Sequence, residues 1–116
     1  KHDTSTDAND PNENRAYDRI FTWLGREPGN PLVVVSQKAL TGHSKGGAAA
    51  WQLAGLCQAI AQGRLPGNAN LDDPDPECGM LRHVRNAPEP AKIDFAVSNS
   101  FGFGGNNTCL VLKKAA

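Results

Sequence analysis

Near the start of the chain, apolar residues recur at the spacing of a helix. Four large residues share one helical face: Tyr17, Ile20, Phe21 and Leu24. The preceding Asp10-Pro11-Asn12-Glu13 has the composition of a helix start, with Asp10 as N-cap, proline at the first helical position and Glu13 closing a capping box. The pattern predicts a helix over about 11–24, with Gly25 as its stop.

A second helical pattern runs through the middle of the chain. Ser44 can cap it, and Gly63 can end it after Gln62. Its face is dense in Gly and Ala, which lets neighbouring backbones approach closely, so we expect this helix deep in a layered core. Larger residues complete its apolar side: Leu53, Leu56, Cys57 and Ile60.

Short β-branched and alternating runs predict strands between and after the helices. The run 32–35 has no polar alternation, which indicates a strand buried on both faces. Further strands are expected at 81–85, 93–97 and 107–112, the last two as an antiparallel pair joined by a glycine-rich turn at 101–105. Segments 27–31, 36–43 and 64–80 are expected as a turn, a polar connection and an irregular loop. The fold class is therefore mixed α/β.

Composition limits the possible partners more than it identifies one. The 116 residues amount to one domain at most, and twelve basic residues balance twelve acidic ones. A neutral chain has no broad electrostatic footprint for nucleic acid or an anionic membrane. No apolar run approaches the roughly 20 residues of a membrane span. We therefore expect no nucleic-acid partner and no membrane partner.

The cysteines indicate a reducing compartment and no metal centre. Cys57, Cys78 and Cys109 form an odd set without a CxxC spacing, which argues against a disulfide framework or a zinc site. We expect reduced thiols, a cytoplasmic location and no bound metal.

One local motif suggests a hydrolase. The pentapeptide 42–46 has the G-x-S-x-G spacing of a nucleophile elbow around Ser44, and Asp72 and His83 follow in the order of an α/β-hydrolase triad. An elbow needs its serine directly after a strand, however, and eight residues separate Val35 from Ser44. A serine at a helix start is also explained as a cap, so this interpretation stays an alternative.

Three longer blocks resemble another family, the β-ketoacyl synthases that condense acyl groups in fatty-acid and polyketide synthesis. His2-Asp3-Thr4-Ser5-Thr6 with 9–13 resembles the family's H-x-T-x-T…D-x-x-E stretch. Residues 36–49, with Lys38 five positions before His43, resemble K-x-x-x-G-H-x-x-G-A-A, and residues 98–107 resemble N-S-F-G-F-G-G-T-N. Single residues such as His2 could be structural, but three blocks in order are specific.

The resemblance implies a fold, a reaction and roles for individual residues. It implies the C-terminal portion of a thiolase-like fold, incomplete on its own, with residues 1–116 as one segment. The implied reaction is a decarboxylative Claisen condensation in which His2 and His43 act on a developing oxyanion and Lys38 tunes their charge. Five further positions are implied to bind substrate, the pantetheine arm or the acyl chain: Thr4, Thr6, Phe103, Gly104 and Gly105.

The resemblance also implies partners. The family's nucleophilic cysteine lies in an N-terminal half, and no cysteine here occupies its motif. We expect that half to be supplied in cis or in trans, an acyl carrier protein that brings phosphopantetheine so that no other cofactor is needed, and a homodimer of the full enzyme. A thiolase is disfavoured, because the glycine loop lacks that family's cysteine. A non-catalytic partner subunit resembling a chain-length factor is the main alternative.

Overall fold

A computed structural model describes residues 1–26, 29, 31–78 and 81–116. The longer helices are α1 (Asn9–Trp23) and α3 (Ala48–Gln62), with a four-residue α2 (Lys38–Thr41) between them and single 3₁₀ turns at Lys45–Gly47 and Pro76–Cys78. The strands are β1 (Val33–Val34), β2 (Arg64–Leu65), β3 (Arg82–His83), β4 (Glu89–Pro90), β5 (Phe95–Gly102) and β6 (Asn106–Lys113). The mixed α/β class is confirmed.

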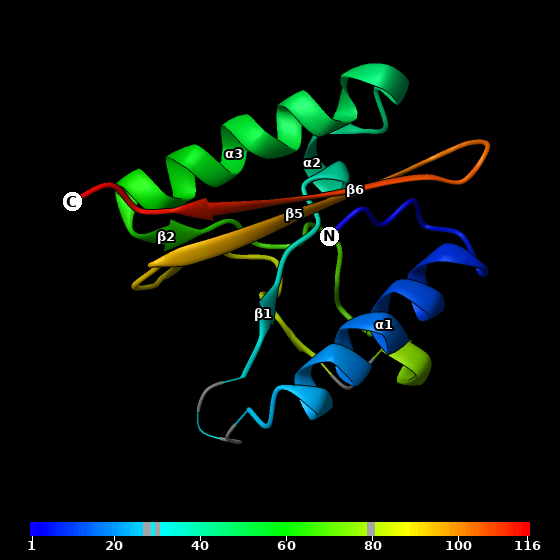
Figure 1. Cartoon of the computed structure of the whole chain (residues 1–116), viewed down its shortest axis with the longest axis horizontal. Coiled ribbons are helices and arrows are strands. Elements are labelled where there is room, and N and C mark those ends of the chain that lie inside the picture. The colour runs from blue at the N-terminus through cyan, green and yellow to red at the C-terminus, as the bar shows by residue number, and fades with distance from the viewer. Residues whose placement is uncertain (27–28, 30, 79–80) are drawn as a thin grey trace.

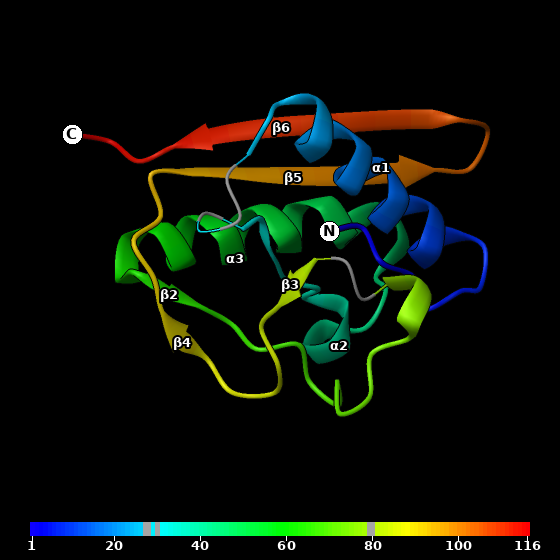
Figure 2. The same cartoon turned by 90° about the horizontal axis from the view of Figure 1, so that it is seen from below.

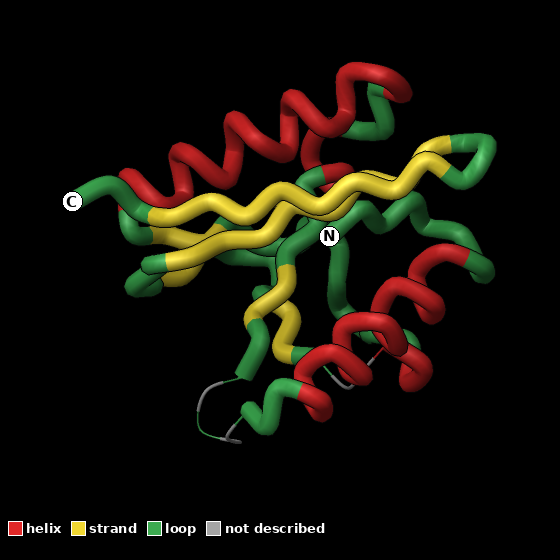
Figure 3. The backbone as a smooth tube through the Cα atoms, in the orientation of Figure 1, coloured by secondary structure: helices red, strands yellow, loops and turns green. Residues whose placement is uncertain are grey.

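The molecule is built around the antiparallel hairpin of β5 and β6. Its register pairs Phe95 with Lys113 at one end and Gly102 with Asn106 at the other. Helix α3 lies along one face of this hairpin and α1 on the opposite face (Figures 1 and 3). In the view from below, the parallel pair β1–β3 lies beside α2, and the small pair β2–β4 lies at the far end of α3 (Figure 2).

Helix α1 ends as the sequence predicts and begins differently. Gly25 adopts φ +64°, its N–H donates to Thr22, and the N–H of Arg26 donates to Phe21, which together form a Schellman stop. The expected cap is wrong: the helix starts at Asn9, after Ala8. The Asp10 and Glu13 carboxylates accept N–H groups of residues 2–4 instead of closing a capping box.

Helix α3 has the predicted end and an unexpected environment. Gly63 stops it in the left-handed conformation at φ +62°. A 3₁₀ turn precedes it, and Ser44 makes no side-chain cap bond. The expectation of deep burial is wrong for this chain, because only Ala48, Gln52 and Ala59 of the helix are buried. The opposite stripe is exposed: Ala50, Ala54, Cys57 and Ala61.

Asn68 holds the short parallel pair together. It is 5% exposed, and its amide donates to the carbonyls of Val34 in β1 at 3.4 Å and of Val84, the residue after β3, at 2.6 Å. The adjacent core consists of Tyr17, Val34 and Leu81, with Leu32 packed against it. The predicted strands at 32–35 and 81–85 are present as β1 and β3, each only two residues long.

Other connections differ in detail from the prediction. The polar connection 36–43 contains α2, and the segment 64–80, expected to be irregular, begins with β2 and contains a 3₁₀ turn. The predicted glycine turn is shorter, since Phe101 and Gly102 still pair within the hairpin and only 103–105 form its loop. The predicted turn at 27–31 lies largely outside the described residues.

Within the described parts of the chain, no helix has both the length and the apolar character needed to cross a membrane.

Candidate active site

Two histidines from distant segments lie together at one end of the molecule. The ring centroids of His2 and His43 are 5.8 Å apart, with the rings nearly perpendicular at 89°. His2 precedes α1 and is 6% exposed, whereas His43 lies in the exposed loop between α2 and α3. The sequence expectation that these two residues converge is confirmed.

The local backbone selects one tautomer of the His43 ring. The N–H of Lys45 donates to His43 Nδ1 at 3.1 Å. A ring nitrogen that accepts a hydrogen bond carries no proton, so a neutral His43 has its proton on Nε2. This geometry leaves Nε2–H as a hydrogen-bond donor for a group outside the loop.

His2 lies in a setting that favours its neutral form. Its ring contacts Phe101 of β5 at a centroid distance of 5.3 Å, and its Nδ1 has no hydrogen-bond partner among the described residues. Burial lowers the pKa of His2, and the positive charge of Lys38 and the neighbouring His43 lower it further. The His2 imidazole is therefore disposed to act as a neutral group.

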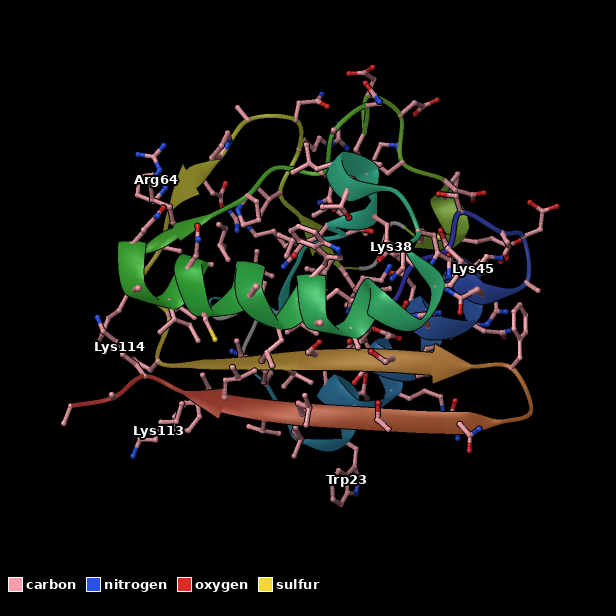
Figure 4. The ribbon with its side chains drawn as sticks, turned by 90° about the horizontal axis from the view of Figure 1, so that it is seen from above. Trp23, Lys38, Lys45, Arg64, Lys113 and Lys114 are labelled. Atoms are coloured by element: carbon pink, nitrogen blue, oxygen red, sulfur yellow. The ribbon has the colours of Figure 1, made fainter. Side chains whose placement is uncertain are left out.

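Lys38 reaches into the same site from the start of α2. Its ammonium group donates to the main-chain carbonyl of His2 and, at 2.8 Å, to Gln52 Oε1. Burial lowers the pKa of Lys38, while the carboxylates of Glu13, Asp3 and Asp10 act in the opposite direction. Figure 4 shows Lys38 and Lys45 at the same end of α3, away from Arg64, Lys113 and Lys114.

Glu13 fixes the segment that carries His2. Its two carboxylate oxygens accept the main-chain N–H groups of His2 at 2.8 Å and Asp3 at 2.9 Å. The side chain is 2% exposed, and burial raises its pKa. Glu13 is thus a structural acid beneath the site, and a local capping rule could not find this role because its partners precede the helix.

The threonines of the first block lie in the segment between His2 and α1. The N–H of Thr4 donates to Asp10 Oδ1 at 3.0 Å, and the hydroxyls of Thr4 and Thr6 lie 3.1 Å apart. Thr6 is exposed and Thr4 is half-buried. Both hydroxyls are therefore reachable by a ligand, and their expected role in binding pantetheine stays a prediction.

The strand before the glycine loop brings a phenylalanine against His2, and the expected role of Phe103 at the acyl chain stays a prediction. Phe103, Gly104 and Gly105 form the hairpin tip, where both glycines have φ near +80° and Phe103 is 96% exposed. Phe101, two residues earlier, is the ring that contacts His2. The sequence block 98–107 indicated the glycine loop. The position of each phenylalanine along β5 and the loop determines that Phe101 contacts His2.

A buried amide that the sequence analysis missed connects these parts. Gln52 of α3 is 4% exposed; its Oε1 accepts from Lys38, and its Nε2 donates to the carbonyl of Asn99 at 3.0 Å. Asn99 in turn donates to the hydroxyl of Tyr17 at 2.7 Å. The available signal was one polar side chain on the helix face that also carries Ala48 and Ala59.

The hydrolase triad does not assemble. Ring nitrogen Nε2 of His83 is hydrogen-bonded to the carbonyl of Cys78 at 2.8 Å, and Asp72 Oδ1 accepts from Asn86 at 2.8 Å. Ser44 is exposed in the loop beside His43. Since His83 and Asp72 are engaged elsewhere, the structure gives Ser44 no base from the predicted set.

The remaining nucleophile and metal candidates are also separate from the histidines. The three cysteines are free thiols on α3, in the 76–78 turn and on β6. Among the residues that the structure describes, no group of three or more His, Cys, Asp or Glu side chains could hold a metal ion. The described site therefore contains donors and a cation but no paired nucleophile.

Comparison with known proteins agrees with this site. Residues 1–72 match the family model "Beta-ketoacyl synthase, C-terminal domain". The chain is 48% identical over 107 residues to fatty acid synthase alpha subunit pigJ of Monascus ruber, covering 89% of this chain and 6% of that protein. It is 43% identical over 113 residues to 3-oxoacyl-[acyl-carrier-protein] synthase 2 of Synechocystis sp., covering 97% of this chain and 26% of that protein.

Solved structures share the fold as well. A type II PKS acyl-carrier protein in complex with its ketosynthase bound to the hexaketide, AntDE:AntF, matches with a TM-score of 0.84 and 32% identity, over 99% of this chain and 27% of the matched chain. The fold and the site together define the class as the thiolase-like condensing enzymes, as the sequence blocks implied. The chain belongs to the β-ketoacyl synthase family, of which it carries the C-terminal domain.

Proposed function

We propose that this chain supplies the oxyanion-stabilising half of a β-ketoacyl-[acyl carrier protein] synthase. The observation that carries the proposal is the His2–His43 pair, edge-on at 5.8 Å, with the Nε2 proton of His43 fixed by the Lys45 N–H. Two imidazole N–H donors close together can stabilise an oxygen that becomes negative during reaction. An enolate formed by decarboxylation is such an oxygen.

The proposed reaction has two stages. A cysteine thiolate of the synthase takes an acyl group from a thioester and releases the carrier thiol. Malonyl-[acyl carrier protein] then loses carbon dioxide, and the electron pair left on carbon forms an enolate whose oxygen accepts the N–H groups of His2 and His43. That carbon attacks the acyl-cysteine carbonyl, the carbon–sulfur bond breaks, and the thiolate is restored with a β-ketoacyl thioester as product.

The proposed place of Lys38 is electrostatic. Its ammonium group donates to the main-chain carbonyl of His2, so a positive charge lies close to that imidazole. A nearby cation disfavours the imidazolium form and keeps the ring a neutral donor. No proton has to be transferred by Lys38 for this effect.

The nucleophile and the remaining walls of the site are proposed to come from the rest of the synthase, in cis or in trans. The structure offers two surfaces for it. One is the exposed stripe of α3 that includes Ala54 and Cys57. The other is a groove of about 660 Å³ between α1, β1, α3 and β5, lined mainly by apolar side chains and including Ile20, Leu24 and Phe95.

The substrate is proposed to arrive on an acyl carrier protein, whose phosphopantetheine arm would serve in place of a separate cofactor. The open position of Thr4 and Thr6 supports their contact with that arm. Phe103, Gly104 and Gly105, which form the tip of the β5–β6 hairpin, are proposed to border the acyl chain, with the glycines allowing close backbone approach. The solved ketosynthase relative in complex with its carrier protein supports this partner class.

Two further features complete the proposal. We expect the full enzyme to be a homodimer. We also place it in the cytoplasm, a compartment compatible with three free thiols.

A non-catalytic subunit resembling a chain-length factor is the alternative. Such a subunit has no reaction to run and no need for two histidines and a lysine in hydrogen-bonded proximity. The Lys45-to-His43 bond and the Lys38-to-His2 bond therefore favour the catalytic interpretation.

The test uses the full-length protein, meaning the complete synthase that joins this chain, in cis or in trans, to the half with the nucleophile. Purified protein is supplied with an acyl thioester and malonyl-[acyl carrier protein], and the carrier-bound product is identified by mass spectrometry. We expect a β-ketoacyl product two carbons longer than the starter, and the same product from Ser44→Ala. Absence of condensation in a folded, cysteine-acylated protein would overturn the proposal in favour of the non-catalytic subunit.

A further inference from the structure

The residues on either side of His2 form a buried ion pair. Lys1 Nζ lies 2.8 Å from Asp3 Oδ1, and the two side chains are only 3% and 13% exposed. A second pair with the same residue types and spacing, Lys92 and Asp94, lies 3.4 Å apart with side chains 87% and 57% exposed. An exposed pair contributes little to stability, whereas breaking a buried pair leaves an uncompensated charge.

Asp3 occupies a backbone conformation that disfavours a side chain. Its φ is +31°, in the left-handed region that glycine adopts most readily. A residue strained in this way persists only where the surrounding structure over-determines it. The side chain of Asp3 supplies a contact that glycine could not make, namely the buried pair with Lys1.

The pair constrains the residue between its members. In an extended segment, the side chains of residues i and i+2 lie on one side and that of residue i+1 lies on the other. Lys1 and Asp3 meet on one side of the segment. The ring of His2 contacts Phe101 and His43. A change in the main-chain torsions of His2 would move the ammonium of Lys1 away from the carboxylate of Asp3, so the pair limits these torsions.

The other polar contacts of this segment hold only its main chain. Glu13 accepts the N–H groups of His2 and Asp3, and Lys38 donates to the carbonyl of His2. The Nδ1 atom of the His2 ring has no hydrogen-bond partner among the described residues. The orientation of the ring therefore depends on its packing and on the torsions that the ion pair limits.

The pair supplies this constraint without adding net charge beside the imidazole. Burial and the positive charge of Lys38 lower the pKa of His2, whereas the carboxylate of Asp3 acts to raise it. The ammonium of Lys1 lies directly against that carboxylate and offsets its charge. His2 is thus held in place while its neutral form stays favoured.

We propose that the Lys1–Asp3 ion pair positions His2 in the condensing site, with Lys1 and Asp3 as positioning residues for the oxyanion donors. The inference rests on the proposed function for its effect on the reaction. The position of His2 itself can be measured without any reaction.

The test measures how firmly His2 is held in the complete synthase. Diethylpyrocarbonate modifies neutral imidazole, and at pH 8 the ring of His2 is neutral in both the native and the unfolded protein. Its protection is the ratio of the modification rates in unfolded and native protein, followed by peptide mass spectrometry. In the double variant Lys1→Ala/Asp3→Gly, protection should fall at least about tenfold. Lys92→Ala/Asp94→Ala is the matched control and should leave it unchanged.

The double variant is chosen because it leaves neither charge unpaired and relieves the backbone at residue 3. Its thermal midpoint should therefore be higher than that of Lys1→Ala, which leaves a buried carboxylate alone. It should accept an acyl group on its cysteine at the wild-type rate but condense about 10- to 100-fold more slowly, because a donor is misplaced. A general structural defect would slow both steps alike.

The outcomes separate this inference from the proposed function. Unchanged protection of His2 in the folded double variant would overturn the positioning role, whatever the condensing activity of the wild type. If that variant does not fold, Lys1→Met/Asp3→Asn removes both charges at similar volume, and unchanged protection there would again overturn the proposal. Reduced protection combined with a wild-type synthase that does not condense would refute the proposed function alone.

Discussion

The histidine site and the apolar surface over the groove and around α1 differ in how many of their side chains find partners within this chain. At the histidine end, the buried polar groups largely find partners within the chain: Glu13 accepts two N–H groups, and Lys38 and Gln52 bond one another. Over the groove and around α1, large apolar side chains remain open, with Trp23 84% and Phe95 63% exposed. Figure 4 shows Trp23 pointing away from α3.

The difference follows from the energetics of the two kinds of group. A buried polar group left without a partner costs about 1–3 kcal/mol, so a precise polar site must be organised by nearby backbone. Apolar surface is stabilised by any well-fitting cover at about 25 cal/mol per Å². The polar site is therefore organised by the nearby backbone of this chain, whereas the apolar surface can be stabilised by any well-fitting cover.

The largest effect is expected at the histidine end. His43→Ala in the full-length protein should lower kcat for condensation by about 10²–10³-fold, because one oxyanion donor is lost. His43→Gln, which keeps an N–H donor, should recover part of that loss. Lys45→Ala is the control, since the bond to His43 comes from its main chain. Equal kcat for His43→Ala and wild type would refute the role of the pair.

Replacement of Glu13 should lower the stability of the protein and not only its catalytic rate. Glu13→Ala leaves the N–H groups of His2 and Asp3 unpaired. We expect the free energy of unfolding to fall by about 2–4 kcal/mol. Glu13→Gln keeps one acceptor and should lose less. The denaturant midpoint of the full-length protein measures both, and an unchanged midpoint for Glu13→Ala would contradict the account.

Gly67, next to Asn68, packs closely against another stretch of backbone, and its replacement should have a smaller effect on stability. A Cβ on Gly67 would lie 2.3 Å from the main-chain oxygen of Asn86, which has no flexible end to move away. Gly67→Ala should therefore destabilise the protein by about 1–3 kcal/mol. The thermal midpoint of unfolding measures this effect. Gly46→Ala is the control and should change that midpoint little, because a Cβ there meets nothing within 4 Å.

Alkylation of Cys57 tests the uncovered surface. The thiol lies on the exposed stripe of α3. If the rest of the synthase covers this stripe, iodoacetamide should modify Cys57 at least about tenfold more slowly in the native full-length protein than after unfolding, because such protection reflects the cost of local opening. Equal rates in the two states would show that the stripe stays open.

The smallest effect concerns pH. Burial lowers the pKa of His2 and of His83 below the ordinary value of 6.5. The folded state then binds fewer protons than the unfolded state, so their contribution is present above pH 6.5 and is lost as pH falls through the lowered values. The thermal midpoint should decline on acidification, and His83→Gln should make the decline shallower. An identical slope in this variant would exclude His83 as a contributor.

Local rules predicted the C-terminal ends of the two long helices and the presence of the hairpin. They did not predict the contacts that form the site. Gly25 and Gly63 end their helices because each adopts a positive φ. The sequence shows glycine, the residue that adopts this conformation most readily, at both positions. The carboxylate of Glu13 was assigned to a helix cap because its true partners, the N–H groups of residues 2 and 3, reach it only after the chain folds back.

The site residues were predictable to the extent that motifs carry them. Ordered blocks identified His2, Lys38 and His43, and the structure brings all three together. The strand register, which places Phe101 rather than Phe103 against His2, and the long-range bonds of Gln52 had no counterpart in local pattern. The exposed face of α3 could not be predicted, because a face rich in Ala and Gly indicates that another backbone can approach closely but not that one does.

The central claim is that the chain holds the donors while the nucleophile lies elsewhere in the synthase. The most direct measurement is acylation of the full-length protein with an acyl thioester, followed by peptide mapping, in wild type and in His43→Ala. The account predicts an acyl group on a cysteine outside residues 1–116 in both proteins, with subsequent condensation impaired in His43→Ala. An acyl group on Ser44, or on Cys57, Cys78 or Cys109, would contradict it.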